Sequence, residues 1–65
     1  MIRVGYTKTD GTDVIYETVS GASNANNSIL ELQESKLGDT SIDCFYLSMQ
    51  ITETEWDKYA FIDPL

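Results

Sequence analysis

The sequence predicts an α+β fold, a small two-layer domain with the element order ββαβα. We expect a three-stranded antiparallel sheet of order 2-1-3, packed against one or two short helices. Three observations lead to this expectation. Apolar residues alternate on both sides of an early Asp-Gly pair, which is typical of a β-hairpin. A second alternating run follows later in the chain. Two Ser/Thr-x-x-Glu sequences indicate helix starts.

The hairpin is expected over residues 2–19. Its strands flank Asp10-Gly11, a pair suited to the central positions of a type I′ turn. The resulting register places Tyr16 opposite Gly5, where the tyrosine ring would cover the glycine. Glu17 is then the one residue out of character on an otherwise apolar face.

A loop and a short helix should follow the hairpin. Residues 20–27 (Ser-Gly-Ala-Ser-Asn-Ala-Asn-Asn) are small and polar, and such side chains compete with backbone hydrogen bonds, so they predict a loop. Ser28 and Glu31 have the spacing of a capping box, which predicts a helix over residues 29–37. Gly38 suits the left-handed position that ends a helix.

The third strand is expected over residues 41–51, and it is the most apolar segment of the chain. One face of this strand is uniformly apolar and should point into the core, and it carries Phe45, Leu47, Met49 and Ile51. The other face carries Ile42, Cys44 and Tyr46 and has no obvious cover. The sheet order 2-1-3 leaves this strand at an edge. Exposed aromatic patches often mark interfaces, so the predicted sheet-face interface comprises Tyr16, Ile42 and Tyr46.

A second helix is expected over residues 53–61. Thr52 and Glu55 form a second capping box, and Ile51 and Trp56 have the spacing of a hydrophobic staple. The helix should end before Asp63-Pro64, since the residue before proline disfavours helix.

The composition limits the possible chemistry. The chain has 65 residues, which predicts a single domain (1–65), with no histidine and a single cysteine. An intrachain disulfide and a zinc site are therefore not expected, and no cofactor or metal is predicted. Cys44 is expected to be a structural residue, because a catalytic thiol needs a basic neighbour. We expect no enzymatic activity. Oligomerisation is a candidate source of extra stability for so short a chain.

The charge of the chain is strongly negative, −7 at pH 7, from eleven acidic and four basic residues. Direct nucleic-acid binding and binding to anionic membranes are therefore not expected. With no signal peptide or membrane span in the sequence, a cytoplasmic location is the default. The acidic residues near the third strand and last helix form a predicted partner-binding patch comprising Asp39, Asp43, Glu53, Glu55 and Asp57. The alternative is that the acids in the last helix serve only its first-turn electrostatics.

These features favour a non-enzymatic acidic protein that binds and inhibits or modulates another protein, one with a basic, nucleic-acid-binding surface. The chain is similar in size and charge, though in no sequence motif, to small inhibitors of host defence carried by phages and mobile elements. Some of those proteins mimic the charge of nucleic acid. The alternative is a homo-oligomeric scaffold module, dimerising through the sheet edge or the tyrosine face.

Overall fold

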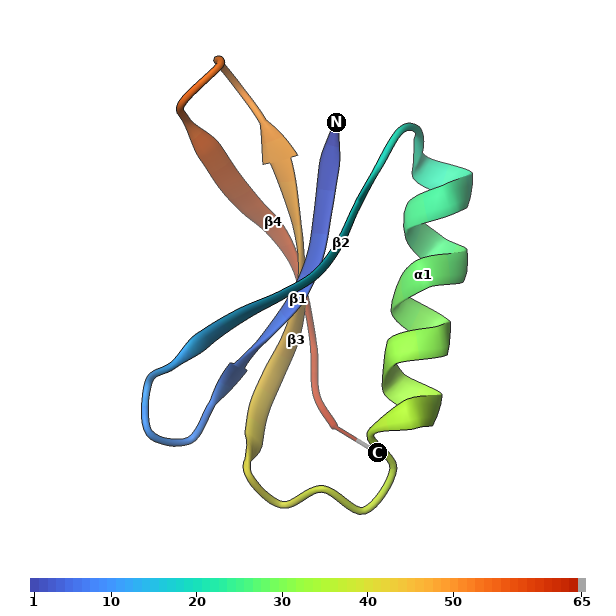
Figure 1. Ribbon diagram of the computed structural model, residues 1–65, viewed down its shortest axis with the longest axis vertical. Coiled ribbons are helices and arrows are strands. Elements are labelled where there is room, and N and C mark those ends of the chain that lie inside the picture. The colour runs from blue at the N-terminus through green and yellow to red at the C-terminus, as the bar shows by residue number, and fades with distance from the viewer. Residues whose placement is uncertain (65) are drawn as a thin grey trace.

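The computed structural model describes residues 1–64 and shows an antiparallel sheet with a helix on one side of it (Figure 1). The elements are, in chain order, β1 (Ile2–Lys8), β2 (Asp13–Val19), α1 (Ala22–Ser35), β3 (Ile42–Gln50) and β4 (Trp56–Ile62). The four strands lie in the order β2-β1-β3-β4. The predicted α+β class is therefore confirmed, whereas a fourth strand takes the place of the predicted second helix.

The N-terminal hairpin forms as predicted, but its register differs beyond the first few pairs. Ile2 pairs with Val19, as expected, yet Gly5 pairs with Ile15. The register shifts by one residue within β2, and Tyr16 is the extra residue of the resulting bulge. The predicted pairing of Tyr16 with Gly5 is therefore wrong.

The turn of this hairpin is longer than the predicted two-residue loop. A type I′ turn needs positive φ at both central residues, and Gly11 has it (φ 91°) while Asp10 does not. The Lys8 N–H instead donates to the Thr12 carbonyl oxygen at 2.8 Å. The Asp10 carboxylate accepts the Thr12 N–H at 2.9 Å. Asp10 thus shapes the turn through its side chain.

The helix begins earlier than predicted, at Ala22, so the expected loop over 20–27 is wrong. Ser28, the expected N-cap, lies in the helix interior and is buried. The helix also ends earlier, at Ser35 rather than residue 37.

The reason is packing, which outweighs the weak helix propensity of the Asn/Ser segment. The residues of α1 that are buried against the sheet have the helical spacing i, i+3, i+4, i+7, and they are Ala25, Ser28, Ile29 and Leu32. Two of these four side chains are small, so the helical pattern of buried residues cannot be recognised from bulky apolar residues alone. The Ser and Asn residues at 23, 24, 26 and 27 are exposed to solvent.

The second predicted helix, 53–61, is wrong, because β4 occupies most of these residues. The Glu55 N–H does donate to the Thr52 hydroxyl at 3.1 Å, as a capping box requires. However, the Ile51 N–H donates to the Glu55 carbonyl oxygen at 2.9 Å, and the chain turns back along β3. The same local hydrogen bond here lies within the chain reversal between β3 and β4. Trp, Tyr, Phe and Ile make up four of the seven residues of β4, and all four favour strands.

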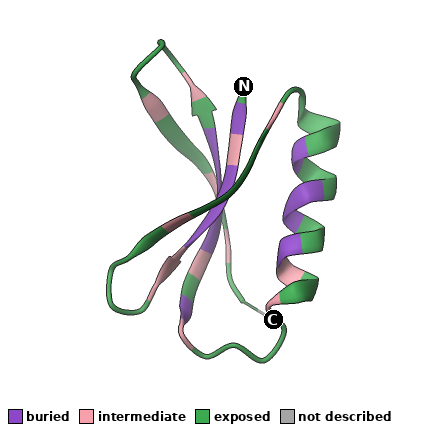
Figure 2. Ribbon diagram, in the orientation of Figure 1, coloured by how far each residue is buried: buried purple, intermediate pink, exposed green. Residues whose placement is uncertain are grey.

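The hydrophobic core lies between α1 and the sheet, as Figure 2 shows by the buried stretches of β1, β3 and the inner side of α1. Val4, Leu32 and Phe45 are its largest fully buried side chains. The rings of Tyr6 and Phe45 meet edge to face with centroids 6.1 Å apart. The predicted core positions Phe45 and Leu47 are confirmed.

Three other residues of the predicted third strand lie elsewhere than expected. Ile42 is buried in the core rather than on the opposite face, because β3 bulges at Asp43 and the alternation reverses there. Met49 and Ile51, expected in the core, are exposed. With β4 beside it, β3 is an interior strand, so the predicted position at a sheet edge is also wrong.

Candidate protein-binding face

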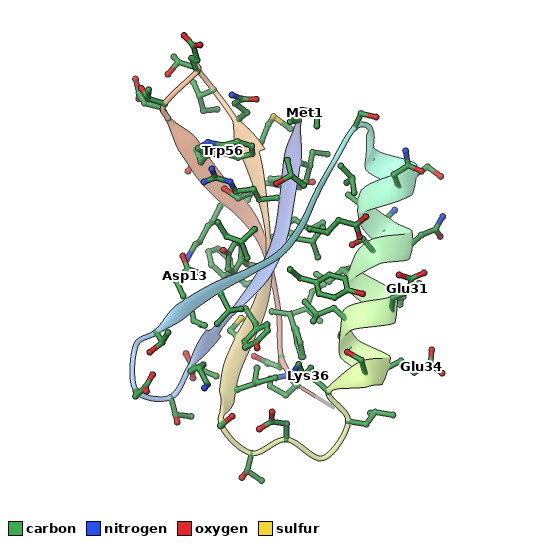
Figure 3. The ribbon with its side chains drawn as sticks, viewed as in Figure 1. Met1, Asp13, Glu31, Glu34, Lys36 and Trp56 are labelled. Atoms are coloured by element: carbon green, nitrogen blue, oxygen red, sulfur yellow. The ribbon has the colours of Figure 1, made fainter. Side chains whose placement is uncertain are left out.

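The sheet has a second face, turned away from α1, that no element of residues 1–64 covers. We call it the open face. Val4 and Tyr6 of β1 point into the core, so their neighbours in the strand point to the open face. Strand pairing extends this face across the sheet to include Arg3, Gly5, Thr7, Asp13, Ile15, Cys44, Tyr46, Ser48, Trp56, Lys58 and Phe61. Figure 3 shows Asp13 and Trp56 on this side.

Tyr46 lies at the centre of the open face, with its ring over Gly5. A Cβ atom added to Gly5 would clash with the backbone oxygen of Val14, and it would lie 2.8 Å from the Tyr46 hydroxyl oxygen and 2.9 Å from Cζ. Only glycine therefore allows the ring to lie flat against β1. The sequence predicted a tyrosine over this glycine, but from Tyr16 of β2. The correct partner is Tyr46 of β3, and its side chain is 3% exposed.

The Tyr46 hydroxyl reaches past β1 to β2. It donates a hydrogen bond to Asp13 Oδ1 at 2.7 Å. Burial, together with this hydrogen bond and the charge of Asp13, raises the pKa of Tyr46 above its ordinary value. The phenol therefore stays a neutral donor across the physiological pH range.

Lys58 of β4 completes this group from the other side. Its Nζ lies 4.2 Å from the centroid of the Tyr46 ring and 3.6 Å from Asp13 Oδ2. The ion pair is half exposed and contributes at most about 1 kcal/mol. Together, Asp13, Tyr46 and Lys58 join the two outer strands across the sheet; we call them the cross-sheet triad.

A second stacked pair lies beside the triad. The Arg3 guanidinium carbon is 3.8 Å from the centroid of the Trp56 ring. Trp56 therefore contacts a cation from β1, and the predicted staple with Ile51 is wrong. Both cations of the open face thus lie on aromatic rings, which limits the conformations of their long side chains.

Two exposed apolar side chains flank this ordered centre. Ile15 on β2 is 50% exposed, and Phe61 on β4 is 65% exposed. They end a row that crosses all four strands, because Ile15 pairs with Gly5, Gly5 with Tyr46, and Tyr46 with Phe61. Aromatic residues and arginine in the centre of a surface, with apolar anchors beside them, are typical of protein interfaces.

The predicted sheet-face interface of Tyr16, Ile42 and Tyr46 is only partly reproduced. Tyr46 is on the open face, though largely buried by its neighbours. Tyr16 is exposed at the bulge of the edge strand β2, and Ile42 belongs to the core. The sequence reasoning missed Arg3, Lys58 and Phe61, because two of them were assigned to a helix. The available signal was the high content of strand-favouring aromatic and β-branched residues in the segment 56–62.

The predicted acidic patch does not form one surface. Asp39 and Asp43 lie at the end of the sheet where β3 begins, and Glu53 and Glu55 lie in the β3–β4 turn at the opposite end (Figure 1). Asp57 is opposite Met49, away from the open face. The five residues were expected together because a helix was predicted after β3, whereas a strand separates them.

One of these acids has a local structural role. The Asp39 carboxylate accepts hydrogen bonds from the Ser41 hydroxyl at 2.6 Å and the Ser41 N–H at 2.9 Å. These bonds lower the pKa of Asp39. Asp39 therefore shapes the connection between α1 and β3.

No group of three or more potential metal ligands occurs within residues 1–64. No helix in this range is long and apolar enough to cross a membrane. Comparison with protein-family models, with curated protein sequences and with solved structures gives no match to this chain.

Proposed function

We propose that this chain is a non-enzymatic protein-binding module and that the open face is its contact surface. The observation that carries the proposal is the row of Ile15, Tyr46 and Phe61. It places two exposed apolar anchors on either side of an ordered aromatic centre. Burial of such anchors supplies most of the affinity of typical interfaces, and a centre ordered before binding reduces the entropy lost on binding.

The charge of the chain supports a partner with a basic surface. The two cations of the open face contact aromatic rings, and one of them is also paired with Asp13. Acidic side chains lie beyond both ends of the sheet, at Asp10 and at Glu53 and Glu55. A negative border around an apolar surface steers association with a positive partner. Proteins that handle nucleic acids carry such surfaces, and binding there would inhibit or modulate them.

The experiment is affinity capture from the native host followed by direct binding measurements with the captured protein. Ile15→Thr with Phe61→Thr should abolish capture, because it removes both anchors and keeps strand-forming residues. Leu30→Gln is the matched control, since Leu30 is equally exposed on the outer side of α1. Capture retained by the open-face variant, or lost equally with Leu30→Gln, would contradict the proposal.

A second copy of this chain is the alternative occupant of the open face. The observation that favours it is the exposure of Phe61 beside the free edge of β4. Such an edge can pair with a symmetry mate and extend the sheet. Self-association of this acidic chain should strengthen as the salt concentration rises, whereas binding to a basic partner should weaken.

A further inference from the structure

A pocket of about 470 Å³ lies between the end of β2 and the first half of α1, on the helix side of the sheet. It is separate from the open face. One wall is the end of β2 from Glu17 to Val19, together with Ser20 after it. The other is a stripe of α1 with the helical spacing i, i+3, i+4, i+7, made of Asn24, Asn27, Ser28 and Glu31. Met1 also lines the pocket.

The chemistry of the lining is strongly biased toward hydrogen-bond acceptors and negative charge. Glu17 and Glu31 contribute two carboxylates, and no basic side chain lines the pocket. The one cationic group on a lining residue is the α-ammonium of Met1, which pairs with neither glutamate within 4 Å. The Asn24 amide nitrogen donates to the Ser20 carbonyl oxygen at 2.8 Å, which leaves its amide oxygen as an acceptor. Met1 and Val19 add apolar surface against which an aliphatic chain can lie.

Glu17 is the most informative residue of this pocket. It pairs with the fully buried Val4 on the helix side of the sheet, where the strand pattern calls for an apolar residue, and it is itself exposed to solvent. One of its carboxylate oxygens accepts a hydrogen bond from the buried Ser28 hydroxyl at 2.7 Å. This bond fixes the carboxylate at the pocket wall. No lysine, arginine or N-terminal nitrogen within residues 1–64 lies within 4 Å of a carboxylate oxygen of Glu17 or Glu31, so both negative charges are free to meet an external cation.

We propose that this pocket receives an arginine side chain from a partner protein. The guanidinium group presents five N–H donors in a fixed plane, which matches several acceptors arranged around one pocket. Its three methylene groups match the apolar wall of Met1 and Val19. The inference rests on the proposed function in one respect, that the partner carries a basic surface. It identifies a second contact on the opposite side of the sheet.

The test needs no partner. Amide chemical shifts of the full chain are followed by NMR while N-acetyl-arginine methylamide is added to millimolar concentrations. Saturable shifts should appear at residues 17–20 and 24–31. The neutral citrulline analogue, which has the same shape without the charge, should produce none.

Two substitutions make the test specific. Glu17→Gln retains an acceptor for the Ser28 hydroxyl while removing the charge, so the fold is preserved. It should weaken arginine binding by about tenfold, the expected loss for one charge-assisted hydrogen bond. Glu31→Gln should act similarly. Glu34→Gln, one turn further along α1 and outside the pocket, should have no effect.

Equal shifts with the citrulline analogue, shifts spread over the whole surface, no shifts at the pocket, or unchanged binding by Glu17→Gln would each overturn the inference. A negative result in this titration would not affect the conclusions drawn from the open-face variants. Failure of the open-face variants would leave the arginine titration standing, so the two proposals fail separately.

Discussion

At the scale of single residues, Tyr46 is the side chain of the open face that contacts all three of the other strands. Its ring covers Gly5, its hydroxyl binds Asp13, and its face meets the Lys58 ammonium. The hydrogen bond to Asp13 depends on the neutral phenol, because a phenolate has no proton to donate and would repel the carboxylate. The ionisation of Tyr46 should therefore be coupled to folding.

The alkaline stability of the protein tests this coupling. The pKa of Tyr46 is raised in the folded state above the value of 10.0 that it has in the unfolded chain. The neutral phenol therefore stabilises the fold fully below pH 10.0, and this stabilisation declines as the pH rises above that value. Tyr46→Phe should cost about 1 kcal/mol at neutral pH through loss of the hydrogen bond to Asp13. The difference from wild type should shrink above about pH 10.

Urea denaturation at neutral and alkaline pH measures this difference. Tyr59→Phe is the matched control, since Tyr59 is exposed on β4 and makes none of these contacts, and it should follow the wild type. A Tyr46→Phe curve parallel to wild type over the whole pH range would show that the phenol is not coupled to folding.

At the scale of secondary-structure elements, the sequence predicts well where strong alternation or a turn glycine is present. The first hairpin and β3 are such elements. The start of α1 could not be predicted, because Ala25 and Ser28 complete its buried stripe with small side chains. That residues 56–62 form a strand could not be predicted from Thr52 and Glu55, because the same hydrogen bond can serve a helix cap or a connection between two strands. Only the neighbouring free edge of β3 decides between them.

The corrected helix start makes a prediction of its own. Ala25 is fully buried against the sheet, whereas Ala22 is exposed on the same helix. Ala25→Leu should destabilise the protein by about 1–3 kcal/mol through overpacking. Ala22→Leu should change stability by no more than about 0.5 kcal/mol. Chemical denaturation of both variants gives the comparison, and similar values for the two would indicate that residues 20–27 are a loop after all.

The candidate site was predictable only in part at this scale. Tyr46 could be placed opposite the core from strand alternation alone. Arg3 and Trp56 come together only because β4 lies beside β3, and the pairing of Asp13 with Lys58 requires both outer strands. Long-range contacts of this kind depend on the sheet order, which no local pattern specifies.

At the scale of the whole molecule, the net charge of −7 separates the two occupants proposed for the open face. Two identical chains repel each other, and salt screens that repulsion. Self-association should therefore strengthen with salt, whereas binding to a basic partner should weaken.

Sedimentation and binding measurements between low salt and about 1 M salt give the comparison. At about 1 M salt the Debye length falls to about 3 Å, so charges on the two surfaces are almost fully screened. We expect a monomer throughout the range and partner binding that decreases as salt rises. A dimer that becomes tighter with salt would favour the scaffold alternative. Ile15→Thr with Phe61→Thr, which leaves the net charge unchanged, should remove such a dimer if the open face forms it.

The cross-sheet triad also has a consequence for the timing of synthesis. Asp13 belongs to the first hairpin and Lys58 to the last strand, so the two ends of this link leave the ribosome far apart in time. Tyr46 and its ring contacts with Gly5 can form earlier, but the Lys58 contact, Phe61 and the Arg3–Trp56 stack require β4. A chain without β4 therefore has no complete open face. Recognition of a partner through the open face is therefore available only after β4 has been translated and has paired with β3.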